Sequence, residues 1–146
     1  MRYLTKEWYL AAQARSVTPD IQKRLDDASA AYRAAQAREA LPDGLRERFF
    51  FHDGVVLECR AGADYTLRID CPFSPSHTVV FRSASVRGEQ PPPGALWLYE
   101  ELYRHKSGRG YEAHILFWHM EKPVHRNLRD TDLLDLKIIC SDILFE

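Results

Sequence analysis

The hydrophobic period of this chain changes at one point, Asp53-Gly54, and no other feature of the sequence constrains its fold as strongly. Before this point, apolar residues recur at spacings of three and four, which is the period of one face of a helix. After it, apolar and polar residues alternate, which is typical of strands with one buried face. Helices followed by an antiparallel sheet define the α+β class, and we expect this class.

The helical part is expected to cover residues 1–50 and to contain two helices. Thr5 can cap the first helix. Thr18, Pro19 and Asp20 form a stronger start for the second, because a capping hydroxyl is followed by proline at the first helical position and then by an acid. Apolar residues share one face of this second helix: Ile21, Leu25, Ala28, Tyr32 and Ala35. We therefore expect the two helices to pack on the sheet.

Residues 51–146 are expected to form a strongly twisted antiparallel sheet of about five or six strands. Alternation at 55–61 and 65–71 predicts a first hairpin. Residues 96–103 and 110–120 are expected to form a second hairpin, although the residue types of 97–103 also suit a short helix. Further strands are predicted at 78–86 and at 134–140, the latter continuing to 143–145.

Composition limits the partners and the location of the chain. Its 146 residues, of which 45% are hydrophobic, suffice for a single domain over 1–146 with an apolar core. The 20 basic and 21 acidic residues leave a net charge of -1, which argues against nucleic acid or a membrane surface as the main partner. No apolar stretch is long enough to span a membrane, and no signal peptide is recognisable. Three cysteines without C-x-x-C spacing are typical of reduced thiols, so we expect a cytoplasmic protein.

Histidine is the residue type that most suggests a metal, and the chain has six: His52, His77, His105, His114, His119 and His125. Neither H-E-x-x-H nor a paired C-x-x-C occurs, and on a strand His114 and His119 would point to opposite faces. We expect no metal site. The chain also lacks a glycine-rich phosphate loop, and we expect no cofactor.

Two pairs, each of a histidine and an acidic residue, suggest a possible enzymatic function. His52-Asp53 precedes the first strand and could combine a general base with an orienting carboxylate, but the same pair also fits a plain turn. Glu112 and His114 would share one face of a strand. Together these four residues would form a cleft at the mouth of the sheet, in a small-ligand-binding protein or a hydrolytic enzyme. The turn interpretation is favoured, and no catalytic residue is predicted.

Glu100 and Glu101 are adjacent acids in the second hairpin. On a strand their side chains would point to opposite faces, so at most one of them faces a cleft.

Aromatic residues are concentrated in the second hairpin, and they are the types that anchor protein interfaces. They are Trp97, Tyr99, Tyr103, Tyr111 and Trp118. We expect at least half of these rings to cover the helices instead. The favoured function is a non-enzymatic protein-interaction module that binds a protein partner or a second copy of itself. The candidate binding residues are His52, Asp53, Trp97, Tyr99, Tyr103, Tyr111, Glu112 and His114.

A third hypothesis is nucleic-acid binding, which would require four cations on one face: Arg46, Arg48, Lys106 and Arg109. The balanced overall charge argues against it.

Four parts of the chain carry a resemblance to a known family: 1–9, His52-Asp53 with 55–57, 96–103 with 110–114, and 140–143. Together they resemble an uncharacterised bacterial family, the domain-of-unknown-function family numbered 4085. The resemblance implies the α+β fold and a single domain, but no reaction, because the family has no established activity. Members of that family carry a longer, acidic helical insert where this chain has the alanine-rich residues 16–41. This chain would lack any function that belongs to the insert.

Residues 51–145 are also similar, more loosely, to immunity proteins of bacterial toxin systems. The similarity rests on His52-Asp53 before a strand, on the hairpin and on a closing strand around Cys140. It implies a compact cytosolic module that neutralises a protein partner.

Overall fold

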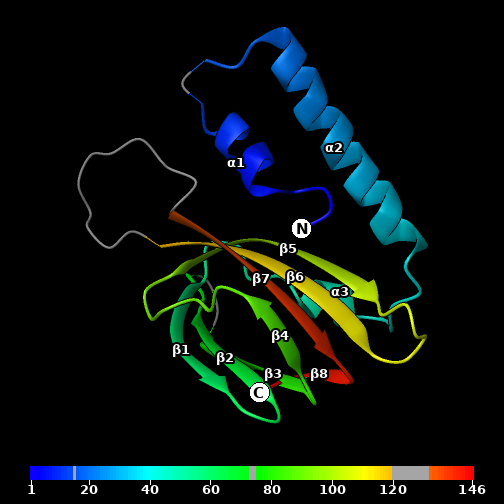
Figure 1. Cartoon of the computed structure of the whole chain (residues 1–146), viewed down its shortest axis with the longest axis vertical. Coiled ribbons are helices and arrows are strands. Elements are labelled where there is room, and N and C mark those ends of the chain that lie inside the picture. The colour runs from blue at the N-terminus through cyan, green and yellow to red at the C-terminus, as the bar shows by residue number, and fades with distance from the viewer. Residues whose placement is uncertain (15, 73–74, 120–131) are drawn as a thin grey trace.

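A computed structural model describes the chain except for residue 15, residues 73–74 and residues 120–131. The described residues contain three helices and eight antiparallel strands, which confirms the α+β class. Figure 1 shows the first two helices on one side of the sheet, with the N-terminus between them and the strands. Among the helices of the described part, none combines the length and the apolar character needed to cross a membrane.

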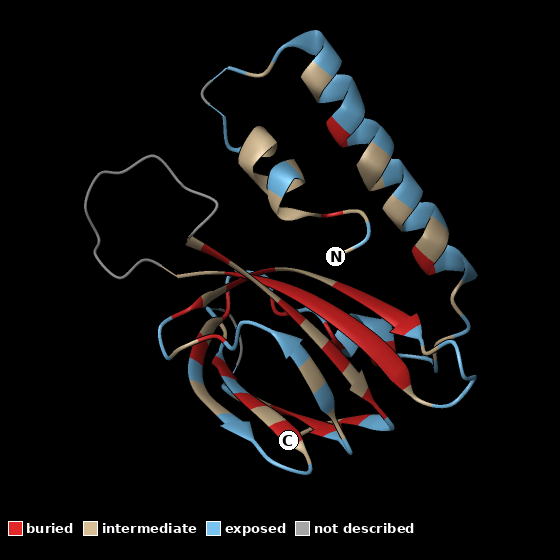
Figure 2. Cartoon of the chain, viewed as in Figure 1, coloured by how far each residue is buried: buried red, intermediate tan, exposed pale blue. Residues whose placement is uncertain are grey.

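The helices are α1 (Lys6–Ala12), α2 (Pro19–Arg38) and the short α3 (Leu45–Arg48). The first two begin where the sequence predicts, because Thr5 accepts a hydrogen bond from the Trp8 N–H at 3.2 Å and Thr18 accepts one from the Ile21 N–H at 3.4 Å. The predicted apolar face of α2 is its covered face. Much of the helix is nevertheless exposed, and its two fully buried residues are Leu25 and Gln36 (Figure 2).

The sheet has the strand order β4-β7-β6-β5-β1-β2-β3-β8. Its strands are β1 (Val55–Ala61), β2 (Tyr65–Asp70), β3 (His77–Arg82), β4 (Ser85–Gly88), β5 (Leu96–Arg104), β6 (Tyr111–Trp118), β7 (Leu133–Cys140) and β8 (Asp142–Phe145). The ambiguous segment 97–103 is therefore strand. Met120, the predicted end of the strand that forms β6, lies outside the described residues.

The predicted count of five or six strands is wrong, because two stretches predicted as single strands are each divided by a bend. Ser83, with a φ of 47°, separates β3 from β4, and Ser141 separates β7 from β8. The Ser141 N–H donates to the Arg82 carbonyl at 2.9 Å, which joins the two bends. Apolar alternation continues through such bends, so the sequence pattern does not show them.

These bends fold the sheet onto itself. β3 pairs with β8 at one end of the strand order, and β4 pairs with β7 at the other. Along the chain, however, two residues join β3 to β4 and one residue joins β7 to β8. The ends of the sheet must therefore approach each other around a common core. Both halves contribute buried apolar residues to that core: Val56, Ile69 and Phe81 from one half, and Trp97, Phe117 and Leu136 from the other.

β5 has one edge that the sheet leaves largely uncovered. It pairs with β6 along most of its length, but its pairing with β1 is confined to Leu96 opposite Val55. Side chains cover the rest of this edge by binding carbonyl groups two residues apart: Leu98 by His52, Glu100 by Tyr32 and Leu102 by Gln36. These contacts satisfy edge groups that would otherwise be open to another strand.

Candidate functional site

The space between α2 and this edge of β5 contains a cavity of about 370 Å³, which we call the α2–β5 cavity. Its wall combines aromatic rings with polar side chains from segments that lie far apart in the sequence. The lining residues that matter here are Trp8, Tyr32, Gln36, Phe50, Tyr99 and Glu100. A cavity of this size, mainly apolar and with few polar groups, is typical of ligand sites.

Glu100 supplies the acid of the α2–β5 cavity. The Nε1–H of the fully buried Trp97 donates to Glu100 Oε2 at 2.6 Å and holds the carboxyl at the margin of the core. Burial raises the pKa of Glu100 to about 7, and the hydrogen bond from Trp97 lowers it only in part. Near neutral pH this carboxyl therefore exists in both protonation states, which is the property of a residue that can exchange a proton with a ligand.

Gln36 supplies an unpaired acceptor. Its side-chain Nε2 donates to the Leu102 carbonyl at 2.9 Å, and this contact fixes which way the amide points. Gln36 is only 5% exposed, and its Oε1 has no hydrogen-bond partner within the described residues. An unpaired buried amide oxygen costs about 1–3 kcal/mol of stability, and this oxygen is closed to solvent.

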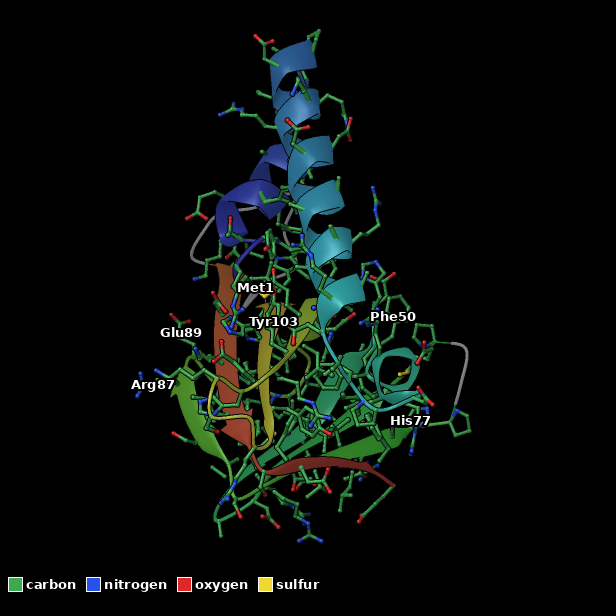
Figure 3. All side chains as sticks on the ribbon, turned by 90° about the vertical axis from the view of Figure 1, so that its right-hand side faces the viewer. Met1, Phe50, His77, Arg87, Glu89 and Tyr103 are labelled. Atoms are coloured by element: carbon green, nitrogen blue, oxygen red, sulfur yellow. The ribbon has the colours of Figure 1, made fainter. Side chains whose placement is uncertain are left out.

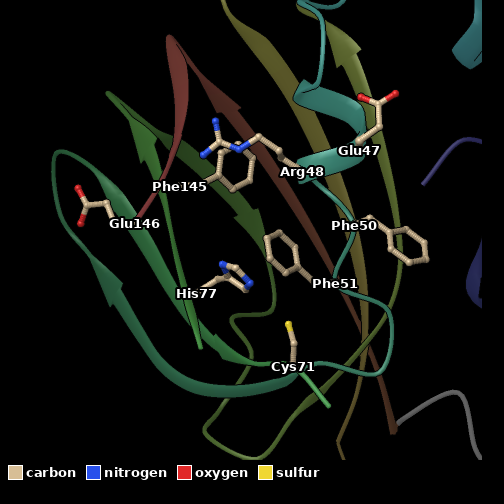
Figure 4. Close-up of a pocket in the computed structure, with 8 residues that line it drawn as sticks. All are labelled: Glu47, Arg48, Phe50, Phe51, Cys71, His77, Phe145 and Glu146. Atoms are coloured by element: carbon tan, nitrogen blue, oxygen red, sulfur yellow. The ribbon is translucent and has the colours of Figure 1, made fainter. Parts of the chain in front are cut away.

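Phe50, which follows α3, is the most exposed large apolar side chain of the described residues, at 65%. It lines the α2–β5 cavity and also a second cavity of about 280 Å³, which we call the α3 cavity. Figure 4 shows this second cavity, with Arg48, Phe51, His77 and Phe145 around it and the Phe50 ring turned away from Phe51. Phe50 is thus an exposed ring between two hollows of side-chain size. Such an arrangement is typical of a contact surface.

A separate polar cluster lies on the face of the sheet beneath the helices, centred on Glu112. His114 Nε2, Lys137 Nζ and an Arg2 guanidinium nitrogen lie 2.7, 3.0 and 2.9 Å from Glu112 Oε1. Burial alone would raise the pKa of Glu112, but these three donors outweigh it and lower the pKa to about 2. Burial also lowers the pKa of His114, despite the opposing effect of Glu112. Burial therefore favours the neutral form of His114, and the buried Nδ1 of this residue has no partner in the described part of the chain.

The adjacent acid, Glu101, holds the first residues against this cluster. Its fully buried carboxylate accepts hydrogen bonds from the N–H groups of Arg2, Tyr3 and Leu4 at 2.6, 2.8 and 2.8 Å. The hydroxyl of Tyr103 donates to the same carboxylate at 2.9 Å. The Arg2 guanidinium lies 3.8 Å above the centre of the Tyr103 ring, and Figure 3 shows Met1 near Tyr103 at the foot of the helices. Glu100 and Glu101 thus face different sites, as strand alternation predicts.

The predicted pairs of histidine and acid are each brought together, but not with each other. His52 Nε2 lies 3.8 Å from Asp53 Oδ1, and His52 Nδ1 bonds the Leu98 carbonyl. Asp53 has a φ of 62°, which belongs to a turn. The Glu112–His114 pair lies beside Glu101, three residues further along β5 than Leu98, which corresponds to roughly 10 Å. The four residues do not form one constellation around a common point.

Most of the predicted aromatic residues pack inside the molecule. Trp97, Tyr103 and Tyr111 are buried, and Trp118 is half-buried. Tyr99 is half-buried and lines the α2–β5 cavity, where its ring meets Trp8 edge to face at 5.4 Å. Of the predicted candidate residues, Tyr99 therefore adjoins the site that we describe.

The other predicted polar residues occupy several places. Arg46 and Arg48 lie on α3, whereas Lys106 and Arg109 lie in the turn between β5 and β6. Among described residues, no group of three or more histidine, cysteine or acidic side chains is arranged to hold a metal. His125 lies outside the described residues. Cys59, Cys71 and Cys140 are free thiols.

Sequence reasoning did not identify Gln36, Phe50 or Glu100 as site residues. A signal for Gln36 was present, because it continues the apolar face of α2 one turn beyond Tyr32 with a polar side chain. For Glu100, strand alternation showed only that it and Glu101 point to opposite faces. Neither Glu100 nor Phe50 could be placed at this site, because nothing in the strand pattern shows that one edge of β5 is left open.

Comparison of the chain with models of protein families, with curated proteins and with solved structures found no match. The resemblances inferred from the sequence therefore stay predictions.

Proposed function

We propose that this chain is a protein-interaction module whose contact surface centres on Phe50. The observation that carries the proposal is the exposed ring of Phe50 between the α2–β5 cavity and the α3 cavity. Exposed aromatic side chains beside pockets are the usual anchors of protein interfaces, and pockets of this kind receive anchors from the partner. This surface has two possible partners. One is a protein that the module neutralises, as an immunity protein would, and the other is a second copy of the chain.

Charged side chains surround this surface in both signs. Arg46, Glu47 and Arg48 precede Phe50 and are exposed. An apolar centre within a charged, solvent-accessible rim is the usual anatomy of an interface that forms reversibly.

The enzymatic hypothesis has less support. It needs His52, Asp53, Glu112 and His114 around one cleft, whereas His52 binds the backbone of β5 and Glu112 is engaged by three cations or donors. We therefore do not propose a reaction.

The test compares Phe50→Ala with Leu57→Ala as bait for affinity capture from the cells that produce the chain. Leu57 is the other large apolar residue exposed in the described part, at 36%, and it lies on β1 away from both cavities. Both variants are expected to unfold within about 0.5 kcal/mol of the parent chain, because exposed truncations change stability little. We expect Phe50→Ala to weaken the affinity for the captured protein at least tenfold and Leu57→Ala to leave it unchanged.

Light scattering on the same samples identifies the occupant. A dimer that dissociates in Phe50→Ala would make a second copy of the chain the partner. Capture that is equally strong with both variants would show that Phe50 is not the centre of the surface. If nothing binds at micromolar concentration while a small molecule raises the melting temperature, the chain is a small-ligand protein and the proposal fails.

A further inference from the structure

We propose that the α2–β5 cavity binds a small aromatic carboxylate. The rings of this ligand fill the apolar interior of the cavity, and its carboxylate meets the guanidinium groups of Arg33 and Arg46 at the rim. The inference goes beyond the proposed function, because the ligand is a free small molecule and not part of a protein partner.

The interior of the α2–β5 cavity is suited to aromatic rings. Trp8 and Tyr99 line it and meet edge to face at 5.4 Å with an interplanar angle of 88°. Phe49 and Phe50 contribute two further rings to the lining. Aromatic rings prefer edge-to-face and offset contacts with one another. An apolar cavity of roughly 150 Å³ can hold benzene, so the volume of about 370 Å³ here accommodates a ligand of two rings.

Three neutral donors of the lining are already engaged within the protein. The Trp8 Nε1–H and the Ser29 hydroxyl donate to the Leu25 carbonyl at 3.3 and 2.9 Å. The Tyr32 hydroxyl donates to the Glu100 carbonyl at 2.8 Å. Because these groups are used, the charged groups of the lining decide which ligand the cavity prefers.

The charged groups of the lining favour an anion. Arg33 on α2 and Arg46 on α3 are exposed, and neither forms an ion pair with a described residue. The Arg46 guanidinium donates to the Gln36 carbonyl near the end of α2, which fixes its position and leaves other N–H groups for a ligand. Among the described lining residues Glu100 is the single acid, so two cations face one carboxyl.

A carboxylate fits this rim better than a phosphate does. Its two oxygens match the paired N–H groups of a guanidinium, and its single charge is repelled less by Glu100 than a doubly charged phosphate would be. Because both arginines are exposed, the charged end of the ligand stays close to water while its rings leave water.

Glu100 makes the binding of an anion depend on pH. Burial raises the pKa of Glu100 to about 7, so its carboxyl is largely protonated at about pH 6 and ionised at about pH 8.5, where it repels a carboxylate. Burial also raises the pKa values of the neighbouring Tyr32 and Tyr99 hydroxyls, so both stay neutral in this range. The ionisable groups around Glu100 are those of Tyr32 and Arg33 on α2, Arg46 on α3 and Tyr99 on β5, with His52 beyond Tyr99.

The test compares 2-naphthoate with 2-naphthamide, which share a two-ring body and differ in charge. Each is titrated into the full chain at about pH 6 and followed by NMR. We expect both to shift signals of residues that line the α2–β5 cavity, the Trp8 Nε1–H included, with naphthoate binding about five- to tenfold more tightly. High salt should reduce this preference, because it screens exposed charges.

The matched variants are Arg33→Gln and Arg24→Gln. Both residues are exposed on α2, but Arg24 does not line the cavity, so the two variants lose the same charge at different places. We expect Arg33→Gln to weaken naphthoate binding about threefold and to leave naphthamide binding unchanged, and Arg24→Gln to change neither. The double variant Arg33→Gln/Arg46→Gln should bind both probes equally. If the double variant does not fold, the comparison of the two single variants decides.

The variant Glu100→Gln tests the dependence on pH. Between about pH 6 and about pH 8.5 the parent chain should lose about threefold or more in affinity for naphthoate, and Glu100→Gln, which keeps His52, should lose less. An equal loss in both proteins would place the dependence on another group.

Several outcomes would overturn the inference. They are equal affinities of the two probes in the parent chain, equal weakening by Arg24→Gln and Arg33→Gln, shifts that map to the α3 cavity beside Arg48, and no binding at millimolar concentration. The proposed function fails separately. Capture of a partner through Phe50 without naphthoate binding would leave the interaction module standing, and naphthoate binding without capture would leave only the carboxylate site.

Discussion

The Nε1–H of Trp97 donates to Glu100 Oε2 at 2.6 Å, so the indole of a fully buried core residue holds the carboxyl that faces the α2–β5 cavity. The two residues are three positions apart on β5, and the register of this strand shifts between Trp97 and Tyr99. The bulge turns Glu100 toward the side of the strand that holds Trp97. A carboxyl in this position is expected to make the stability of the fold depend on pH.

Glu100→Gln should remove a loss of stability that occurs as the pH rises. The pKa of Glu100 is raised from 4.5 to about 7 in the folded chain, so the folded chain keeps a proton that the unfolded chain releases in this window. The contribution of the Glu100 carboxyl to the free energy of unfolding is therefore greatest below pH 4.5. It decreases between pH 4.5 and about pH 7 and is constant above that pH. Glutamine keeps the acceptor for Trp97. We expect the variant to be roughly 1–3 kcal/mol more stable than the parent chain at about pH 8 and similar at about pH 4, measured by urea unfolding. Parallel pH curves for the two proteins would contradict this assignment.

Glu112→Gln should have the opposite dependence in a lower window. The pKa of Glu112 is lowered from 4.5 to about 2, so its contribution is present above pH 4.5 and disappears as the pH falls toward 2. At neutral pH we expect a loss of roughly 1–3 kcal/mol, which should shrink on acidification. Glu58→Gln is the control, because Glu58 pairs with Arg60 at 2.7 Å on the surface and exposed pairs contribute little. A loss at Glu112 that does not change with pH would mean that the ion pairs are not its cause.

Glu101→Gln should release the first residues of the chain from the sheet. A glutamine has one oxygen in place of two, so its NH2 group would face either the Tyr3 and Leu4 N–H groups or the Arg2 N–H and the Tyr103 hydroxyl. We expect a loss of about 2–4 kcal/mol and a strong increase in hydrogen exchange at these three amides. Tyr103→Phe removes one of the four donors and should cost only about 1 kcal/mol. If exchange at residues 2–4 is unchanged in Glu101→Gln, other contacts hold this segment.

Gly110→Ala should be much more destabilising than Gly108→Ala, although both glycines lie in the same turn. Their φ values are 75° and 74°, so each alanine carries a similar backbone penalty of about 1 kcal/mol. A Cβ at Gly108 would meet nothing within 4 Å, whereas one at Gly110 would clash with the Cys140 carbonyl oxygen of β7. Thermal unfolding should place Gly110→Ala below Gly108→Ala by several degrees, because the clash must displace the start of β6 from β7. Equal melting temperatures would show that the turn can move away at little cost.

The elements of this fold were largely predictable, and the reasons are local. Thr5 and Thr18 act as caps within their own helices, and alternation in 65–70 reflects the two faces of one strand. Leu57 shows where local reasoning fails. It lies in an apolar alternation, but the register of β1 shifts between Val56 and Glu58, and Leu57 is exposed. Bulges and bends of this kind depend on the neighbouring strand, which the pattern of one segment does not contain.

The candidate site was not predictable for the same reason. The predicted aromatic residues were chosen by type, but the type does not reveal which side of the sheet becomes the core, and Trp97 and Tyr111 are buried there. Gln36 and Leu102 are 66 residues apart, and their contact exists only because β1 diverges from β5 beyond Leu96.

Residue pattern alone was enough to order helices before strands, to place the helix starts and to separate Glu100 from Glu101 on opposite faces, because each of these depends on residues within a few positions of one another. Long-range packing decided how many strands form, which edge of β5 stays open and which polar groups meet there. Those outcomes depend on the burial of surfaces from segments far apart in the chain, and burial also sets the pKa of Glu100 and leaves Gln36 Oε1 without a partner among the described residues.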